Sequence, residues 1–219
     1  MSPTTDRAPL TRDRILAEAV VLADELGIDA LTMRALAERL GVEAMSLYYH
    51  VKNKDAMLDG MIDTVLADID LPAPDEPWKP AQRRRAESTR AMMSRHPWAA
   101  QLMETRLNPG PTTLAYYEAV LANLRSNGFS VAMAAHAFSA IDAYVYGFGL
   151  QEMNLPFSDE TDIAEPAEAV MSMMPADAYP HLMEMIVDHA LQPGYDYGAE
   201  FTWGLDLVLD GLEQRIDGD

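Results

Sequence analysis

The chain has 219 residues, of which 49% are hydrophobic, and it carries a formal net charge of −19. This apolar content excludes a mainly disordered chain, and the length accommodates one large or two modest domains. The absence of cysteine excludes a disulfide framework, a thiol nucleophile and a thiolate metal site.

The N-terminal residues MSPTTDRAPLTRDR are polar and lack the apolar stretch of a signal peptide. No uncharged apolar run of about 18 residues occurs, so no membrane span is predicted. The composition without cysteine fits a reducing compartment. We therefore expect a cytoplasmic protein.

Helical periodicity begins soon after the N-terminus and continues nearly everywhere. Apolar residues recur at the spacing of one helix face from Ile15 to Leu26. Thr11 is a suitable residue to cap the start of this helix, and Gly27 is suited to end it. The pattern predicts an all-α protein whose first helix lies before Gly27.

Three further helices are predicted up to about Ile69, over residues 33–40, 44–50 and 54–69. Thr32 precedes the first of them as a cap, and Gly41 ends it. Asn53 is placed to cap the last one.

The stretch from Thr32 to Lys54, TMRALAERLGVEAMSLYYHVKNK, has the pattern of a helix-turn-helix. Gly41 permits the positive φ of a tight turn, and the small Ala37 lets two helices cross closely. Val42 and Leu47 have the spacing to fill the angle between the helices. The same spacing also occurs in ordinary helical pairs, so on the residues alone DNA binding and simple packing both remain open.

The helix predicted at 44–50 is about 10 Å long and carries groups suited to a major groove. Ser46 and His50 are expected to face DNA and Leu47 to be core, while Tyr48 and Tyr49 divide between backbone contact and packing. Lys52 and Lys54 follow where they reach phosphate, and Thr32 and Arg34 can hold the opposite backbone.

The distribution of charge supports this interpretation. Residues 1–60 have a net charge of −3 and residues 61–219 a net charge of −16. Within Arg34–Lys54 four bases, including Arg39, face two acids. A locally positive face can therefore contact phosphate while the remainder of the chain repels it.

Prolines at positions 72, 74, 77 and 80 interrupt the helices. We therefore expect a DNA-binding domain over 1–70 and a helical ligand-binding and dimerisation domain over 71–219. The helices predicted in the second domain cover about 79–95, 98–107, 112–127, 130–153, 167–173, 176–191 and 196–215, and residues 154–166 are predicted to form a loop.

The run LTMRALAERLGVEAMSLYYHVKNKDAML resembles the TetR family of bacterial repressors, above all its tetracycline-repressor branch. Weaker similarity in NLRSNGFSVAMAAHAFS and FTWGLDLVLDGLEQRI extends the resemblance over the whole chain. It implies base or phosphate contacts by Arg34, Ser46, Tyr48, Tyr49, His50, Lys52 and Lys54, and it places Ala44 and Met45 at the two leading positions of the recognition helix. We expect Thr32 and Met33 to contact DNA as well. Ala44 and Met45 stand where the tetracycline repressor has a polar residue and a proline, so we expect another operator and contact with a thymine methyl.

The resemblance also implies a homodimer on a two-fold symmetric operator, with its seam on the helix near 130–153 and on the last helix. The residues permit this arrangement, because small residues from Ala132 to Gly149 allow close packing. An apolar stripe from Phe201 to Leu212 offers a second face. The alternative is that these residues form the core of a bundle within one chain.

A pocket for a small, largely apolar effector is expected between helices of the second domain, where most of the 15 methionines lie. The methionines have a plainer interpretation as core filler, and His136 has one as a satisfied core histidine. The residues expected to contact the effector are Thr89, Trp98, Leu102, Thr105, Tyr117, His136, Phe138, Ser139 and Asp142.

No metal or other cofactor is predicted. Leu102 and Ala143 stand where the tetracycline repressor has histidines for its drug–magnesium chelate, so we expect no binding of that chelate. The histidines present lack the spacing of a metal site.

The sequence thus predicts a ligand-responsive transcriptional repressor. A helical protein-interaction module, or an activator without a small ligand, is the alternative. An enzyme is not expected, because no phosphate-binding loop and no nucleophile–base motif is present.

Overall fold

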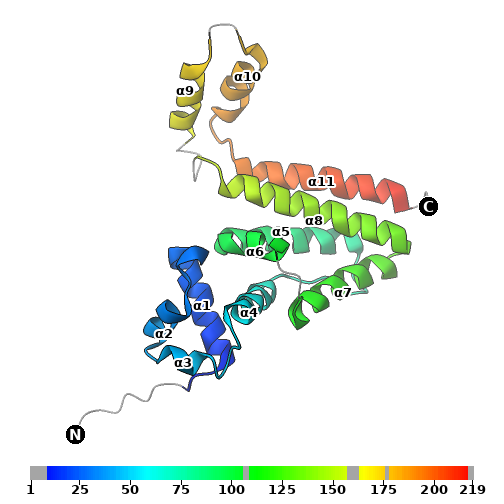
Figure 1. Cartoon of the computed structure of the whole chain (residues 1–219). Coiled ribbons are helices and arrows are strands. Elements are labelled where there is room, and N and C mark those ends of the chain that lie inside the picture. Colours follow the sequence, from blue (N-terminus) through cyan, green and yellow to red (C-terminus); the bar gives the residue numbers. More distant parts are fainter. Residues whose placement is uncertain (1–8, 106–108, 157–162, 176–177, 217–219) are drawn as a thin grey trace. The chain divides into compact units, whose positions relative to one another are not determined.

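The computed structural model describes residues 9–105, 109–156, 163–175 and 178–216. Every regular element among them is a helix (Figure 1), which confirms the all-α prediction. The chain forms two compact units, the first ending at Ser139 and the second starting at Ala140. Helix α8 (Val131–Met153) runs from the first unit into the second.

The first four α-helices form what we call the head, residues 12–66. They are α1 (Arg12–Leu26), α2 (Met33–Leu40), α3 (Ala44–Leu47) and α4 (Lys54–Leu66), with a 3₁₀ turn η1 (Ile28–Ala30) after α1. All three predicted caps are confirmed: the side chains of Thr11, Thr32 and Asn53 accept hydrogen bonds from backbone amides three residues ahead, over 2.8–3.2 Å. Each cap satisfies an amide that the first helical turn leaves unpaired.

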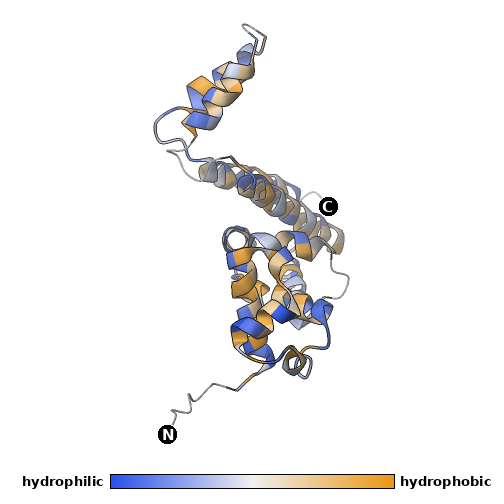
Figure 2. Ribbon diagram, turned by 60° about the vertical axis from the view of Figure 1, so that its left-hand side comes forward, coloured by the Kyte–Doolittle hydropathy of each residue, from blue (hydrophilic) through white to orange (hydrophobic). Residues whose placement is uncertain are grey.

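The first unit continues with α5 (Trp78–Arg95), α6 (Pro97–Thr105), α7 (Pro111–Ser126) and the first part of α8. Figure 2 shows hydrophobic and hydrophilic residues mixed along the helices, and the hydrophobic ones supply the core of this unit. Met92, Trp98, Val120 and Leu124 are among the buried residues. The helix α4 contacts both α6 and α7, which joins the head to the rest of the unit.

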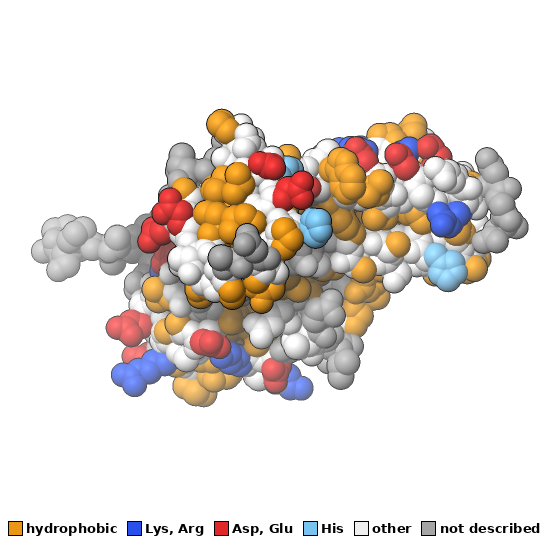
Figure 3. All heavy atoms as spheres, turned by 90° about the horizontal axis from the view of Figure 1, so that it is seen from above, with side chains coloured by type: hydrophobic (Ala, Val, Ile, Leu, Met, Phe, Trp, Pro, Cys, Tyr) orange, Lys and Arg blue, Asp and Glu red, His pale blue; other side chains and the backbone are white. Residues whose placement is uncertain are grey.

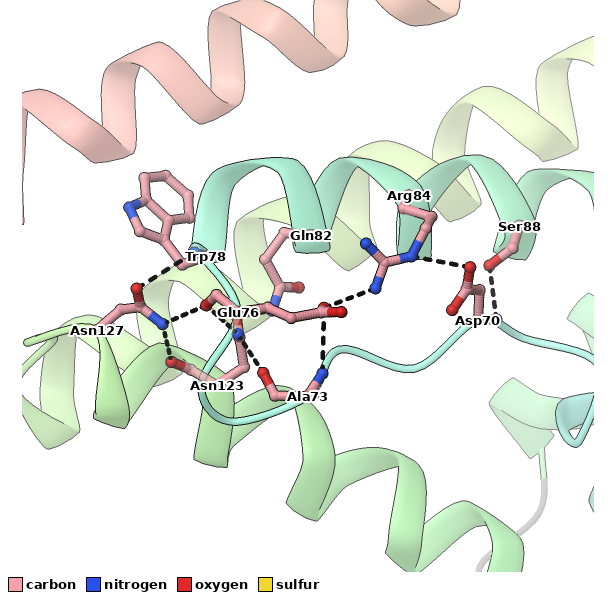
Figure 4. Close-up of polar contacts among 9 residues, drawn as sticks. All are labelled: Asp70, Ala73, Glu76, Trp78, Gln82, Arg84, Ser88, Asn123 and Asn127. Carbon is pink, nitrogen blue, oxygen red and sulfur yellow. Dashed lines mark hydrogen bonds and ion pairs between the residues drawn. The ribbon is translucent and has the colours of Figure 1, made fainter.

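Hydrogen bonds and ion pairs from α5 and α7 hold the proline-containing segment between α4 and α5 (Figure 4). The side-chain amide of Asn123 in α7 donates to the carbonyls of Ala73 and Glu76 over 2.8 and 3.0 Å. On the other side, Arg84 of α5 pairs with Asp70 and with Glu76. The hydrogen bond from Arg84 lowers the pKa of the Glu76 carboxyl. The segment is therefore fixed between α5 and α7.

The second unit contains the rest of α8, then α9 (Ala164–Met173), α10 (Pro180–Met185), a π-helical turn η2 (Ile186–Ala190) and α11 (Tyr197–Ile216). Aromatic rings join α8 to α11, since Phe148 stacks on Tyr197 at 5.1 Å and meets Phe201 edge-on at 5.2 Å. Hydrophobic side chains gather on the exposed face of α9 and α10 (Figure 3), Met173 and Met185 among them.

Several helix boundaries differ from the prediction. α3 ends at Leu47 rather than at His50, because the chain turns there to bury Val51 and to start α4 at its Asn53 cap. α4 ends at Leu66, and residues 67–69 form a turn. α9 begins within the predicted loop 154–166, because Pro166 is tolerated in a first helical turn; residues 157–162 of that loop lie outside the described part of the chain.

The apolar stripe of the last helix is the core of one chain. Phe201, Leu205, Leu209 and Leu212 are buried without a partner subunit. The prediction that this stripe forms the dimer seam is therefore wrong, and the alternative of an intramolecular core applies to it. The apolar residues that α11 exposes are Trp203 and Leu207, at 66% and 57%.

Candidate DNA-reading surface and sensor residues

The turn between α2 and α3 has the geometry that a helix-turn-helix requires. Gly41 adopts φ 64° and ψ 41°, the left-handed conformation that glycine enters without steric cost. The Val42 amide donates to the Ala37 carbonyl over 2.9 Å, which closes the end of α2 as a Schellman motif. Ala37 and Leu47 are buried beneath this turn, so the prediction that Leu47 is core is confirmed.

Arg39 is exposed but is paired with two carboxylates of α1. Its guanidinium pairs with Glu18 and with Glu25 of α1, the latter at 2.5 Å. The hydrogen bonds from Arg39 lower the pKa of the Glu25 carboxyl. The sequence predicts a positive face with four basic residues. Because Arg39 forms ion pairs that join α2 to α1, only the other three remain as candidates for phosphate contact.

The side chains around α3 divide into a buried and an exposed set. Leu47 has no exposed surface, whereas Met45 is 69% and Tyr49 86% exposed. Ser46 is half-buried and His50 exposed, so both are accessible from outside. Tyr48 is 43% exposed, so part of its ring is packed against the head, whereas Tyr49 is almost entirely exposed. Ala44 is half-buried, so Met45 is the more accessible of the two apolar residues that lead the helix.

Three cationic side chains flank this surface. Arg34, Lys52 and Lys54 are exposed, and none of them forms an ion pair with another described residue. Lys54 is the first residue of α4, next to the Asn53 cap. On the other side, Thr32 caps α2 and the half-buried Met33 begins it. In chain order, the exposed residues of α3 are thus preceded by Arg34 and followed by Lys52 and Lys54, all of which suit contact with a nucleic-acid backbone.

The residues predicted to contact an effector differ in their surroundings and belong to both units. Tyr117 and Phe138 do meet, with ring centroids 5.7 Å apart, and Tyr116 lies edge-on to both. His136 and Ser139 are exposed on α8, and Asp142 belongs to the second unit. The plainer interpretation of His136 as a core histidine is wrong, because the side chain is exposed.

The remaining predicted contacts are engaged within their own helices or with the head. The Thr89 hydroxyl is buried and donates to the Arg85 carbonyl over 2.8 Å. The Thr105 hydroxyl is exposed and bonds carbonyls one turn back in α6, where Leu102 is half-buried. Trp98 is buried with its indole N–H on Asp24 of α1, so it contacts the head directly.

The sequence interpretation missed a buried arginine that links α5 to α7. Arg85 has no exposed surface; its Nε donates to Gln82 over 2.8 Å, and its guanidinium also bonds the Tyr116 hydroxyl. The guanidinium carbon lies 5.5 Å from the centroid of the Tyr116 ring. The helical spacing of Trp78, Gln82 and Thr89 places Arg85 on the buried face of α5. The burial of Arg85 could therefore have been predicted from the sequence.

Two kinds of site are not seen in the described residues. No three carboxylate or histidine side chains there converge in a way that could hold a metal ion. Among the described helices none is both long and apolar enough to cross a bilayer.

Two family models match consecutive parts of the chain, and the second match includes the proline segment. The model for bacterial regulatory proteins of the tetR family matches residues 15–61, and that for the tetracyclin repressor-like C-terminal domain matches residues 71–216. The first match contains the helix-turn-helix, and the two together span most of the chain.

Individual relatives cover nearly the whole length. The HTH-type transcriptional repressor DrrR1 of Streptomyces coeruleorubidus is 32% identical over 94% of this chain and 78% of its own. The class D tetracycline repressor protein of Escherichia coli is 31% identical over 95% and 92%. Among solved structures, the Streptomyces coelicolor protein ActR in complex with actinorhodin matches with a TM-score of 0.75 and 31% identity, over 95% of this chain and 99% of that one.

Proposed function

The chain belongs to the TetR family of bacterial regulatory proteins, and from this premise we propose that it represses transcription as a homodimer on a palindromic operator. A small-molecule effector releases it. The DNA-binding domain comprises residues 1–70, and residues 71–219 bind the effector and form the dimer. The protein acts in the cytoplasm and is a regulator rather than an enzyme.

One observation carries the proposal: a single helical turn is anchored by one buried leucine and exposes other side chains to solvent, and exposed cations precede and follow it in the chain. Leu47 anchors this turn in the head, while Met45, Tyr49 and His50 point away from the core. An α-helix end of this size fits the major groove. We assign base or phosphate contacts to Thr32, Met33, Arg34, Ala44, Met45, Ser46, Tyr48, Tyr49, His50, Lys52 and Lys54.

Exposed apolar and small residues support the homodimer. α11 exposes Trp203 and Leu207, and α8 exposes Leu150 together with the alanines at positions 132, 135, 140 and 143. Small residues allow two helices to approach closely. An exposed tryptophan has a large apolar surface, and burying that surface against a partner is favourable. A second copy packed on these faces supplies the second half-site, about 34–36 Å from the first.

The effector is expected to be small and largely apolar, and to bind among the helices of the second domain. The relative ActR was solved with actinorhodin, which supports a small-molecule response here. The aromatic group of Tyr116, Tyr117 and Phe138 is the best-formed part of the predicted contact set. Leu102 and Ala143 in place of histidines argue against the magnesium chelate of tetracycline, and no metal cofactor is proposed.

The decisive experiment is selection of bound duplexes from a random pool with the full-length protein. We expect recovery of a palindromic motif, and a binding constant for it that falls steeply as salt rises. A helical protein-interaction module predicts no enrichment and no DNA binding even at low salt. An activator without a small ligand gives the same motif but raises transcription from a promoter that carries it.

Lys54→Ala is expected to weaken binding to every duplex by a similar factor, because an exposed ammonium at this position contacts phosphate rather than a base. The slope of log K against log salt should fall by about one unit. Titrations of the selected duplex and of an unrelated duplex at several salt concentrations measure both quantities. Loss confined to the selected sequence would contradict the assignment of Lys54 to the backbone.

Ser46→Ala and His50→Ala are each expected to change base preference, because both side chains are accessible at the tip of the head. The loss should be about 1–3 kcal/mol at one base pair and small elsewhere. Repeating the duplex selection with each variant measures this. An unchanged motif would remove the residue concerned from the reading surface.

A further inference from the structure

A carboxylate on the first helix of the head is held by the start of α6. Asp24 accepts a hydrogen bond from the Trp98 indole N–H over 2.7 Å. Its two oxygens lie 2.9 and 3.0 Å from Nδ1 of His96. Trp98 is buried and the side chains of His96 and Asp24 are only 12% and 27% exposed, so water competes weakly for these bonds.

A second carboxylate, on the last helix of the head, is held by the start of α7. Asp63 accepts from the backbone amide of Thr113 over 3.3 Å and from the Thr113 hydroxyl over 3.1 Å. It thereby caps the first turn of α7 from a different helix. Gly110 lies so close that a Cβ at this position would overlap the Asp63 carboxylate.

The two carboxylates belong to the two helices that position the DNA-reading turn. α1 and α4 pack on one another, and α2, which carries the turn, packs on α1. Asp24 fixes one of these helices to the start of α6, and Asp63 fixes the other to the start of α7. The head is thus attached to the rest of the first unit through polar, directional contacts at two places, the start of α6 and the start of α7.

We propose that Asp24 and Asp63 are positioning residues that fix the orientation of the head and so set the half-site spacing that the dimer accepts. This inference rests on the proposed function. Two heads read one operator only if their recognition turns stand one helical repeat apart. An inserted base pair moves the second half-site by about 3.4 Å and rotates it around the duplex. A dimer with rigidly held heads therefore binds the altered duplex much more weakly. A dimer whose heads have lost their carboxylate contacts binds both duplexes with more similar affinity.

A purely structural role for the two carboxylates makes a different prediction. If they only stabilise the fold, their loss lowers stability and weakens binding to all duplexes by one factor. The ratio of affinities for two spacings then stays unchanged. Spacing discrimination therefore separates a positioning role from a structural one.

The test uses the full-length protein, the selected duplex, and the same duplex with one base pair inserted between its half-sites. We expect the wild-type protein to prefer the selected spacing by at least about 20-fold, since a misplaced half-site loses several base contacts. Asp24→Ala/Asp63→Ala should reduce this preference at least fivefold. Gly110→Ala, which displaces the Asp63 carboxylate while retaining the residue, should reduce it in the same direction.

The neighbouring residue Glu25 provides a matched control. It lies on the same helix as Asp24, but its partner Arg39 is within the head. Glu25→Ala should leave the preference for spacing unchanged.

Each outcome distinguishes the two claims. If the wild-type protein selects no duplex, the proposed function fails and the inference fails with it. If the wild-type protein binds and discriminates, but the double variant discriminates equally well, the inference alone is overturned. Should the alanine variants not fold, Asp24→Leu and Asp63→Leu retain side-chain size, remove the hydrogen-bond acceptor and decide by the same ratio.

Discussion

Asn123→Leu is expected to lower the free energy of unfolding by about 2–4 kcal/mol, because leucine fills the volume of asparagine but leaves buried polar groups without partners. Asn123 has no exposed surface. Its Oδ1 accepts from the Gln82 side-chain amide over 3.1 Å, and its Nδ2 donates to the Ala73 carbonyl over 2.8 Å. Both of these groups would lose the bond that Asn123 supplies.

The Glu76 carbonyl is the reason that the loss is not larger. It accepts from Asn123 over 3.0 Å and also from Asn127 over 2.9 Å, so one bond survives the substitution. Urea unfolding followed by far-ultraviolet circular dichroism measures the change.

Asn127→Ala is the control for this experiment. Asn127 is only half-buried, so water can replace part of what it provides, and a loss of about 1 kcal/mol is expected. Equal losses for the two variants, or a loss below about 1 kcal/mol for Asn123→Leu, would show that the network in Figure 4 contributes less than its burial implies.

The features that were predicted correctly depend on contacts near in sequence. Each cap joins residues three apart, as Thr32 and Ala35 show, and the end of α2 needs only the freedom of Gly41. The burial of Leu47 follows from its spacing to its neighbours on one helix face. Such contacts are encoded in a short window of residues, so periodicity and capping preferences suffice to find them.

Contacts between distant residues could not be found in this way. Trp98 was expected to line a pocket, yet its N–H binds a carboxylate 74 residues earlier in the chain. Arg39 was expected to add to a positive surface, yet two acids of α1 neutralise it. Periodicity says which face of a helix is buried, and nothing about which element covers that face.

The last helix illustrates the same limit. The stripe from Phe201 to Leu212 was correctly identified as a buried face, but it packs within the chain. A hydrophobic period does not distinguish a partner helix of the same chain from one of a second copy. The exposed Trp203 and Leu207, outside that stripe, are the stronger indication of a protein partner.

Leu47→Ala is expected to lower the affinity for the selected duplex by at least about tenfold. The reason is that Leu47 is the buried side chain that holds the recognition turn in the head. A fully buried leucine contributes about 2–5 kcal/mol. α3 spans only Ala44–Leu47, too short to persist without tertiary packing. We therefore expect α3 to become disordered and the exposed tip to lose its fixed geometry, which duplex titration measures alongside thermal unfolding.

Met45→Ala is the matched comparison, two residues away on the same turn. Met45 is 69% exposed, so its truncation should leave the melting temperature of the protein unchanged. If Met45 contacts a thymine methyl, replacing that thymine by uracil weakens binding of the wild-type protein but not of the variant. A Leu47→Ala protein that binds as tightly as wild type, or a Met45→Ala protein that melts several degrees lower, would reverse the assignment of anchor and reader on α3.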